Sequence, residues 1–104
     1  MSARYALTFK AEEGLLRIAL YLEEHFGPKV TDDALGRIEK ALNDLAEMPG
    51  IGHAREDLTT DPTISFWSVP PSLIAYRHDR SPIEVLFIER GEMDWEHMLR
   101  ASRP

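Results

Sequence analysis

The spacing of the apolar residues changes at Pro49-Gly50, and this change constrains the possible folds more than any other feature of the chain. Before it, apolar residues recur every three or four positions in two stretches, as on one face of a helix. The first stretch contains Leu15, Ile18, Ala19, Leu22 and Phe26, and the second contains Ala34, Ile38, Ala41, Leu42, Leu45 and Met48. After it come three short apolar runs, at 64–69, 73–78 and 83–89, which are typical of strands. The pattern predicts two helices followed by an antiparallel meander.

The boundaries between these elements carry residues that end helices and turn chains. Gly27 suits the left-handed position after a helix, and Pro28 cannot continue the first helix but can open the next one. So short a link predicts an antiparallel hairpin of the two helices. Pro70-Pro71-Ser72 and the cluster at 79–82 separate the three predicted strands.

Two shorter elements complete the predicted fold. Residues 4–8 form a short strand, and Thr8 can cap the first helix. Asp94 can cap a short C-terminal helix that runs through Leu99. We therefore expect one α+β domain over residues 1–104, in which an N-terminal strand and an antiparallel helical hairpin pack on a mainly antiparallel sheet of about four strands.

Composition narrows the class of partner. The net charge is −6, and each half of the chain carries six basic and nine acidic residues, without a basic run. Nucleic-acid binding needs clustered Lys and Arg, so a protein partner is favoured instead. No apolar stretch is long enough to span a membrane, and the first residues lack the apolar region of a signal peptide. The absence of cysteine is compatible with the cytoplasm, where we expect the protein.

Motifs for metal or cofactor chemistry are weak. His25, His53, His78 and His97 are scattered, and none has a second histidine at a metal-ligand spacing. The serines lack a nucleophile motif, and Gly50-Ile51-Gly52 is too short for a phosphate-binding loop. We therefore expect no metal site and no cofactor.

Arg77 is the most informative of the polar residues. It lies in a predicted strand, between Tyr76 and His78, which point to the opposite face. A charge beneath a helical hairpin needs a carboxylate partner. A structural ion pair is therefore favoured over a catalytic role, and both interpretations stay open.

Four segments together resemble a known family: Tyr5–Thr8, Arg37–Leu42, Met48–Gly52 and Leu73–Arg77. Their order and spacing are similar to those of the ParE branch of the RelE/ParE superfamily of toxin–antitoxin toxins, over nearly the whole chain. The resemblance implies a cytoplasmic toxin of a type II toxin–antitoxin system, neutralised by a ParD-like antitoxin that lies along its helices and sheet. It also implies action on DNA gyrase by protein contact, without enzymatic chemistry of its own.

The RelE branch, whose members cleave ribosome-bound mRNA, is the alternative. Arg55, Arg77 and His78 are the candidates for such a nuclease. The chain lacks a face rich in Lys and Arg, and residues 100–104 lack the terminal Tyr or His common in that branch. The sequence also departs from many ParE-like chains at Phe9 and at 89–93, so a non-toxic remnant that only binds antitoxin stays a third possibility.

Eight residues are candidates for contact with a protein partner. Protein interfaces rely on large apolar anchors within a polar rim, and Arg can meet carboxylates of the partner. The anchor candidates are Leu16, Leu20, Phe66, Trp67 and Trp95, and the charged candidates are Arg55, Arg77 and Arg90.

Overall fold

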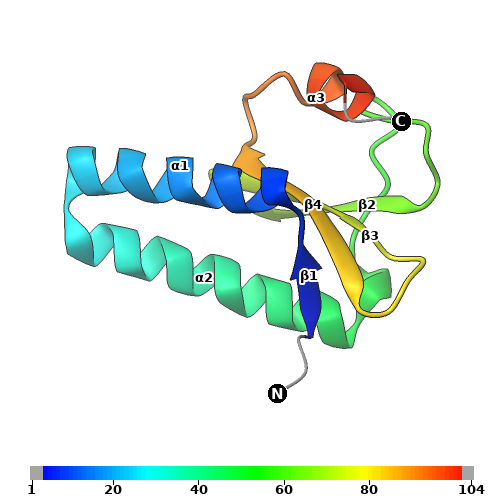
Figure 1. Cartoon of the computed structure of the whole chain (residues 1–104), viewed down its shortest axis with the longest axis horizontal. Coiled ribbons are helices and arrows are strands. Elements are labelled where there is room, and N and C mark those ends of the chain that lie inside the picture. The colour runs from blue at the N-terminus through cyan, green and yellow to red at the C-terminus, as the bar shows by residue number, and fades with distance from the viewer. Residues whose placement is uncertain (1–3, 102–104) are drawn as a thin grey trace.

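A computed structural model describes residues 4–101 of the chain. Its elements in order are β1 (Tyr5–Leu7), α1 (Phe9–Phe26), α2 (Pro28–Glu47), a 3₁₀ turn at Pro49–Ile51, β2 (Ile64–Val69), β3 (Ser72–Arg77), β4 (Ile83–Arg90) and α3 (Trp95–Ala101). The four strands form one mixed sheet in the order β1-β4-β3-β2 (Figure 1). β1 pairs with β4 in parallel, and the other pairs are antiparallel. The predicted α+β fold is confirmed, with strand ends shifted by one residue at most.

The helical hairpin forms where the sequence predicts it. Thr8 caps α1, because its Oγ1 accepts a hydrogen bond of 3.1 Å from the backbone N–H of Ala11. Gly27 has a φ of +85° and donates its N–H to the carbonyl oxygens of Leu22 and Glu23, which ends α1. Pro28 opens α2 at once, so the two helices run antiparallel (Figure 1).

α1 lies unusually close to β4. A Cβ atom on Gly14 would lie only 2.1 Å from the carbonyl oxygen of Ile88, so only glycine allows this approach. Beside it, the carboxylate of Glu89 is buried and forms an ion pair with Arg17. The contact fixes the helical hairpin on one face of the sheet.

Two residues of the predicted helical stripes are not in the core. Phe26 is 60% exposed and Met48 is 54% exposed. The hairpin extends beyond the sheet at the end that contains Phe26, so no strand covers that end (Figure 1). Met48 follows the end of α2. Periodicity gives the face of a helix that turns inward, but not how far the sheet beneath it extends.

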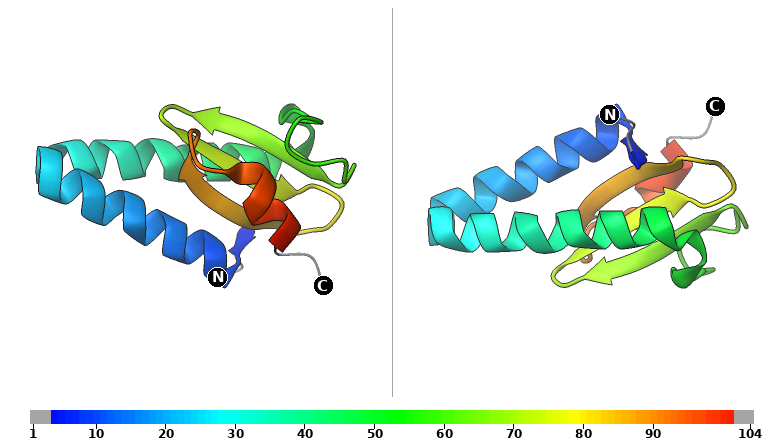
Figure 2. Two further views of the ribbon diagram at one scale, coloured as in Figure 1. Left: turned by 90° about the horizontal axis from the view of Figure 1, so that it is seen from above. Right: turned by 90° about the horizontal axis from the view of Figure 1, so that it is seen from below.

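The opposite face of the sheet has its own apolar cluster, which α3 covers. The two views of Figure 2 place α3 and α2 on opposite sides of the sheet. The strands contribute Ile64, Phe66, Leu73, Ala75 and Phe87 to the buried part of this cluster, and α3 contributes Trp95 and Leu99. The sequence predicts the terminal helix, but the covering of this second face is a finding of the structure.

Tyr76 holds the C-terminal end of the hairpin. Its buried hydroxyl donates a 2.6 Å hydrogen bond to the carbonyl oxygen of Pro49 and accepts one of 3.1 Å from the N–H of Gly52. Burial raises the pKa of Tyr76 above its usual value of 10.0. The turn after α2 is thereby tied to the middle of the sheet.

Candidate functional site

Arg77 is held by side chains from two parts of the chain, the loop before β2 and strand β4. Its Nη1 donates a 2.8 Å hydrogen bond to Thr63 Oγ1 and lies 3.5 Å from Asp61 Oδ2, while its Nε lies 3.6 Å from Glu84 Oε1. The side chain is 27% exposed. These contacts are those of a structural ion pair, the interpretation that the sequence favours.

Arg55 and His78 are engaged elsewhere. Arg55 makes two hydrogen bonds of 2.9 Å to the carboxylate of Asp57, which lower the pKa of Asp57 and raise that of Arg55. His78 Nε2 lies 3.0 Å from the carbonyl oxygen of Pro62. Within residues 4–101, no hydrogen bond or ion pair joins any two of Arg55, Arg77 and His78. The structure does not assemble these three side chains into one constellation.

Phe66 and Trp95, two of the predicted anchors, are buried in the core at 2% exposure each. Phe66 and Phe87 each pack edge-on to the Trp95 ring, with centroids 6.2 Å apart. The Trp95 indole N–H donates to the carbonyl oxygen of Arg90 at 2.9 Å. Neither ring is exposed in this structure, because both belong to the cluster on the second apolar face of the sheet. Contact of either ring with a partner stays a prediction.

Trp67 lies at the surface in part. It is half-buried against the hairpin side of the core and stacks on the exposed imidazole of His53, with centroids 5.8 Å apart. Since His53 also pairs its backbone with Phe66, this stack closes part of the free edge of β2.

Leu16 and Leu20, the other two predicted anchors, are 59% and 61% exposed. Leu16 lines an open groove of about 640 Å³ between α1 and α2, and Leu20 lies one helical turn further along α1. We call this surface the hairpin groove; it is lined by Tyr5, Leu7, Glu12, Leu15, Leu16, Ala19, Asp32, Leu35, Gly36, Ile38, Glu39 and Leu42. Its three charged residues are all acidic.

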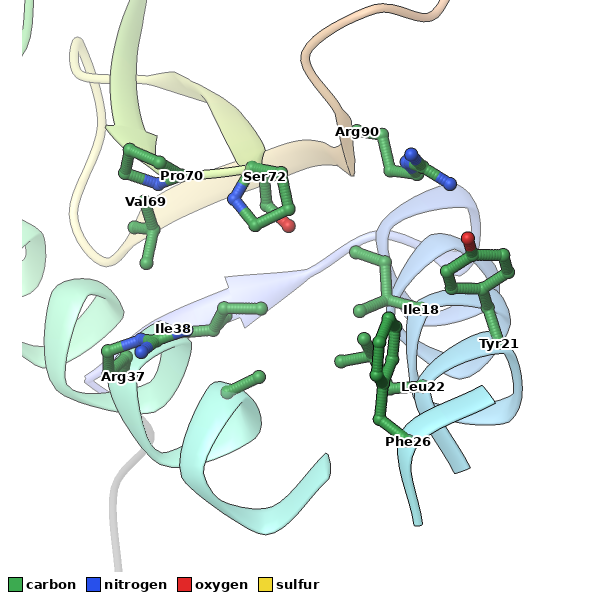
Figure 3. Close-up of a pocket in the computed structure, with 12 residues that line it drawn as sticks. Ile18, Tyr21, Leu22, Phe26, Arg37, Ile38, Val69, Pro70, Ser72 and Arg90 are labelled. Carbon is green, nitrogen blue, oxygen red and sulfur yellow. The ribbon is translucent and has the colours of Figure 1, made fainter. Parts of the chain in front are cut away.

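A second cavity, of about 220 Å³, lies near the free end of the hairpin, between α1, α2 and the β2–β3 turn (Figure 3). We call it the tip pocket; it is lined by Ile18, Tyr21, Leu22, Phe26, Ala34, Arg37, Ile38, Val69, Pro70, Pro71, Ser72 and Arg90. Its two charged residues are both arginines. Arg90, a predicted contact residue, lies here, whereas no sequence pattern selects Arg37 or Tyr21.

Among residues 4–101, no group of three His, Asp or Glu side chains is arranged to hold a metal ion. No helix in the same range is long and apolar enough to cross a bilayer.

Comparison with known proteins identifies the family. Residues 5–95 match the model of the family described as "ParE toxin of type II toxin-antitoxin system, parDE". No curated protein matches the chain. A solved structure of the chromosomal ParDE TA system from P. aeruginosa is similar in fold, with a TM-score of 0.69 and 22% sequence identity over 85% of this chain and 95% of that one. The match to the family model spans most of the chain, and this protein therefore belongs to the family of ParE toxins of type II toxin–antitoxin systems.

Proposed function

We propose that the protein is held inactive by a ParD-like antitoxin that covers the hairpin groove, and that the free protein acts on DNA gyrase by direct protein contact. The observation that carries the first part is the groove itself. It is larger than the tip pocket, Leu16 is exposed in its lining, and Leu20 is exposed one turn further along α1. Exposed apolar side chains gathered along a groove are typical of surfaces that bind another polypeptide.

The similarity to the ParDE system supports an antitoxin as the partner that fills the groove. The solved structure is of a chromosomal ParDE TA system, and it shares its fold with 85% of this chain. The three acidic side chains of the groove, Glu12, Asp32 and Glu39, indicate the chemistry of the segment that would fill it. An amphipathic helix with a flank of Lys or Arg fits such a surface.

Protein contact is favoured over RNA cleavage by the state of the candidate nuclease residues. RNA cleavage needs cationic and proton-transferring groups directed at one phosphate. Here the guanidinium of Arg77 is occupied by Asp61 and Glu84, and that of Arg55 by Asp57. The RelE-like alternative therefore has less support than gyrase, which rests on the family resemblance.

The test measures two target activities side by side. Purified protein at micromolar concentration should inhibit supercoiling by DNA gyrase or trap cleaved DNA, and the protein encoded in the adjacent reading frame should reverse this effect. A translation extract should show no new mRNA cleavage. Cleavage that is lost in Arg77→Ala would instead establish the nuclease. Unimpaired growth on expression, with retained antitoxin binding, would identify a non-toxic remnant.

A further inference from the structure

The tip pocket has the size and walls of a site for one large apolar side chain. Its floor is made of aliphatic and aromatic groups, including Ile18, Leu22 and Ile38 (Figure 3). Its volume is about 220 Å³. An apolar cavity of about 150 Å³ is enough to hold benzene, so an aromatic side chain can enter here without rearrangement of the walls.

The two charged residues that line this pocket are both arginines, and none of its twelve lining residues is Asp or Glu. Arg37 comes from α2 and is exposed, and within residues 4–101 its guanidinium has no hydrogen bond or ion pair. It differs in this from Arg77, whose guanidinium meets two carboxylates. An arginine without a partner beside an apolar cavity is free to bind an incoming anion.

Arg90 faces the same pocket from β4 and is already fixed in position. Its guanidinium lies 4.8 Å from the centre of the Tyr21 ring, which also stacks on His25. Its Nε is buried and makes no hydrogen bond, although Glu92 Oε1 lies 2.6 Å away in an ion pair without hydrogen-bond geometry. Arg90 is thus held in place by Tyr21 and Glu92, and an incoming carboxylate would share its guanidinium with Glu92.

From this geometry we propose that the tip pocket binds an acidic segment of the antitoxin, which inserts one aromatic or large aliphatic side chain while its neighbouring carboxylates pair with Arg37 and Arg90. The inference rests on the proposed function, because it assigns the occupant to the antitoxin. Charge complementarity selects this occupant. A free inorganic anion would leave the apolar floor empty, and a basic segment would be repelled.

The same argument predicts the antitoxin's sequence. The hairpin groove has an acidic rim and the tip pocket a basic one, so a single antitoxin that covers both needs two segments of opposite charge. One is a helix with apolar and basic residues, and the other is a stretch in which an aromatic or aliphatic residue is flanked by Asp or Glu.

The experiment measures the affinity of the full chain for the protein encoded in its adjacent reading frame. Arg37→Glu removes one cation, and Ala34→Trp fills the pocket from α2. Lys40→Glu is the matched control, since it makes the same charge change on the same helix, is 78% exposed and lines neither cavity. We expect each pocket variant to weaken binding at least about tenfold, and the control to stay within about twofold. Circular dichroism confirms that each variant is folded.

Each outcome decides a different claim. If both pocket variants bind as tightly as the wild-type chain, the inference is wrong and the proposed function stands. If the wild-type chain does not bind the adjacent protein at all, the proposed function fails and the inference fails with it. If Arg37→Glu instead shifts the chain alone between monomer and dimer, the occupant is a second copy and the antitoxin assignment is overturned. Exchange of the antitoxin's flanking acidic residues for Lys should restore binding to Arg37→Glu.

Discussion

The hairpin groove and the tip pocket share two helices and the side chain of Ile38, yet they carry opposite charge. The groove is lined by Glu12, Asp32 and Glu39 without a basic residue, and the pocket by Arg37 and Arg90 without an acidic one. The net charge of −6 conceals this division. Net charge affects nonspecific association with nucleic acid, whereas a protein partner responds to the charge of the surface that it contacts.

Arg37 and Glu39 show how closely the two surfaces adjoin on α2. They are two positions apart and therefore point to different sides of the helix. Arg37 lines the tip pocket and Glu39 lines the hairpin groove. One partner chain can consequently distinguish this protein from others by matching both signs, since a mismatch at either surface places like charges together.

Ile38 is the residue through which both surfaces can be disturbed at once. It lines both cavities and is 3% exposed. We expect Ile38→Ala to lower the free energy of unfolding by about 2 to 5 kcal/mol, because it removes apolar burial and leaves a larger void. Chemical denaturation measures this loss. A loss no larger than that of Leu35→Ala, which lines the groove alone, would contradict a shared floor.

The groove is tested by replacing Leu16, which lines it, together with Leu20, which is exposed one turn further along α1. The double variant Leu16→Ser, Leu20→Ser should weaken antitoxin binding by about 10- to 100-fold, because interface anchors concentrate the binding free energy. Stability should hardly change, since both side chains are already mostly in water. Titration calorimetry gives the affinity.

Phe9→Ser is the control for this double variant. Phe9 is 72% exposed on the same helix but lines neither cavity. Equal losses of affinity in Phe9→Ser and in the double variant would show that the antitoxin does not distinguish the groove from the rest of α1.

Sequence reasoning was most successful for elements whose signals are local. Gly27-Pro28, the cap at Thr8 and the proline-rich turns each act within a few residues, so the helical hairpin and the three-stranded meander could be predicted. The second apolar face could not, because the burial of Phe66 and Trp95 depends on where α3 returns to the sheet.

The candidate site was predictable only in part for the same reason. Leu16 and Leu20, selected from the sequence as partner contacts, lie outside the apolar stripe of α1 and are exposed. Their contact with a partner stays a prediction. The tip pocket joins residues from α1, α2, the β2–β3 turn and β4, which are up to 72 positions apart, as Ile18 and Arg90 are (90 − 18 = 72). No local pattern encodes such a set, so Arg37 could be recognised only with its neighbours in place.

Arg77 forms ion pairs and Arg37 forms none within residues 4–101, so their replacement should affect stability differently. Arg77→Ala should lower the free energy of unfolding by about 1 to 3 kcal/mol, because Asp61 and Glu84 lose a charged partner in a partly buried setting. Antitoxin affinity and toxicity per folded molecule should stay unchanged. Denaturation, calorimetry and growth assays measure these three quantities. Arg37→Ala should give the opposite pattern, with little loss of stability and weaker binding.

The smallest expected effect concerns Tyr76, which anchors the turn at the end of α2, one of the two helices that line both cavities. Burial raises its pKa above 10.0, so the folded state holds the phenolic proton more tightly than the unfolded chain does. This contribution to stability is complete below about pH 10 and is lost as the pH rises from there through the raised pKa of the folded state. Tyr76→Phe should cost about 1 kcal/mol at neutral pH through the lost bonds to Pro49 and Gly52.

The dependence of stability on pH above 10 distinguishes Tyr76 from Tyr5, a partly buried tyrosine whose pKa is also raised. Burial and the charge of Glu39 also raise the pKa of Tyr5, so Tyr76→Phe should flatten the fall in stability above pH 10 without abolishing it. Denaturant midpoints at a series of pH values from neutral to alkaline measure the slope, with Tyr5→Phe as the matched variant. An unchanged alkaline slope in Tyr76→Phe would mean that the hydroxyl is open to water, so that the end of α2 shared by both cavities is not fixed by this anchor.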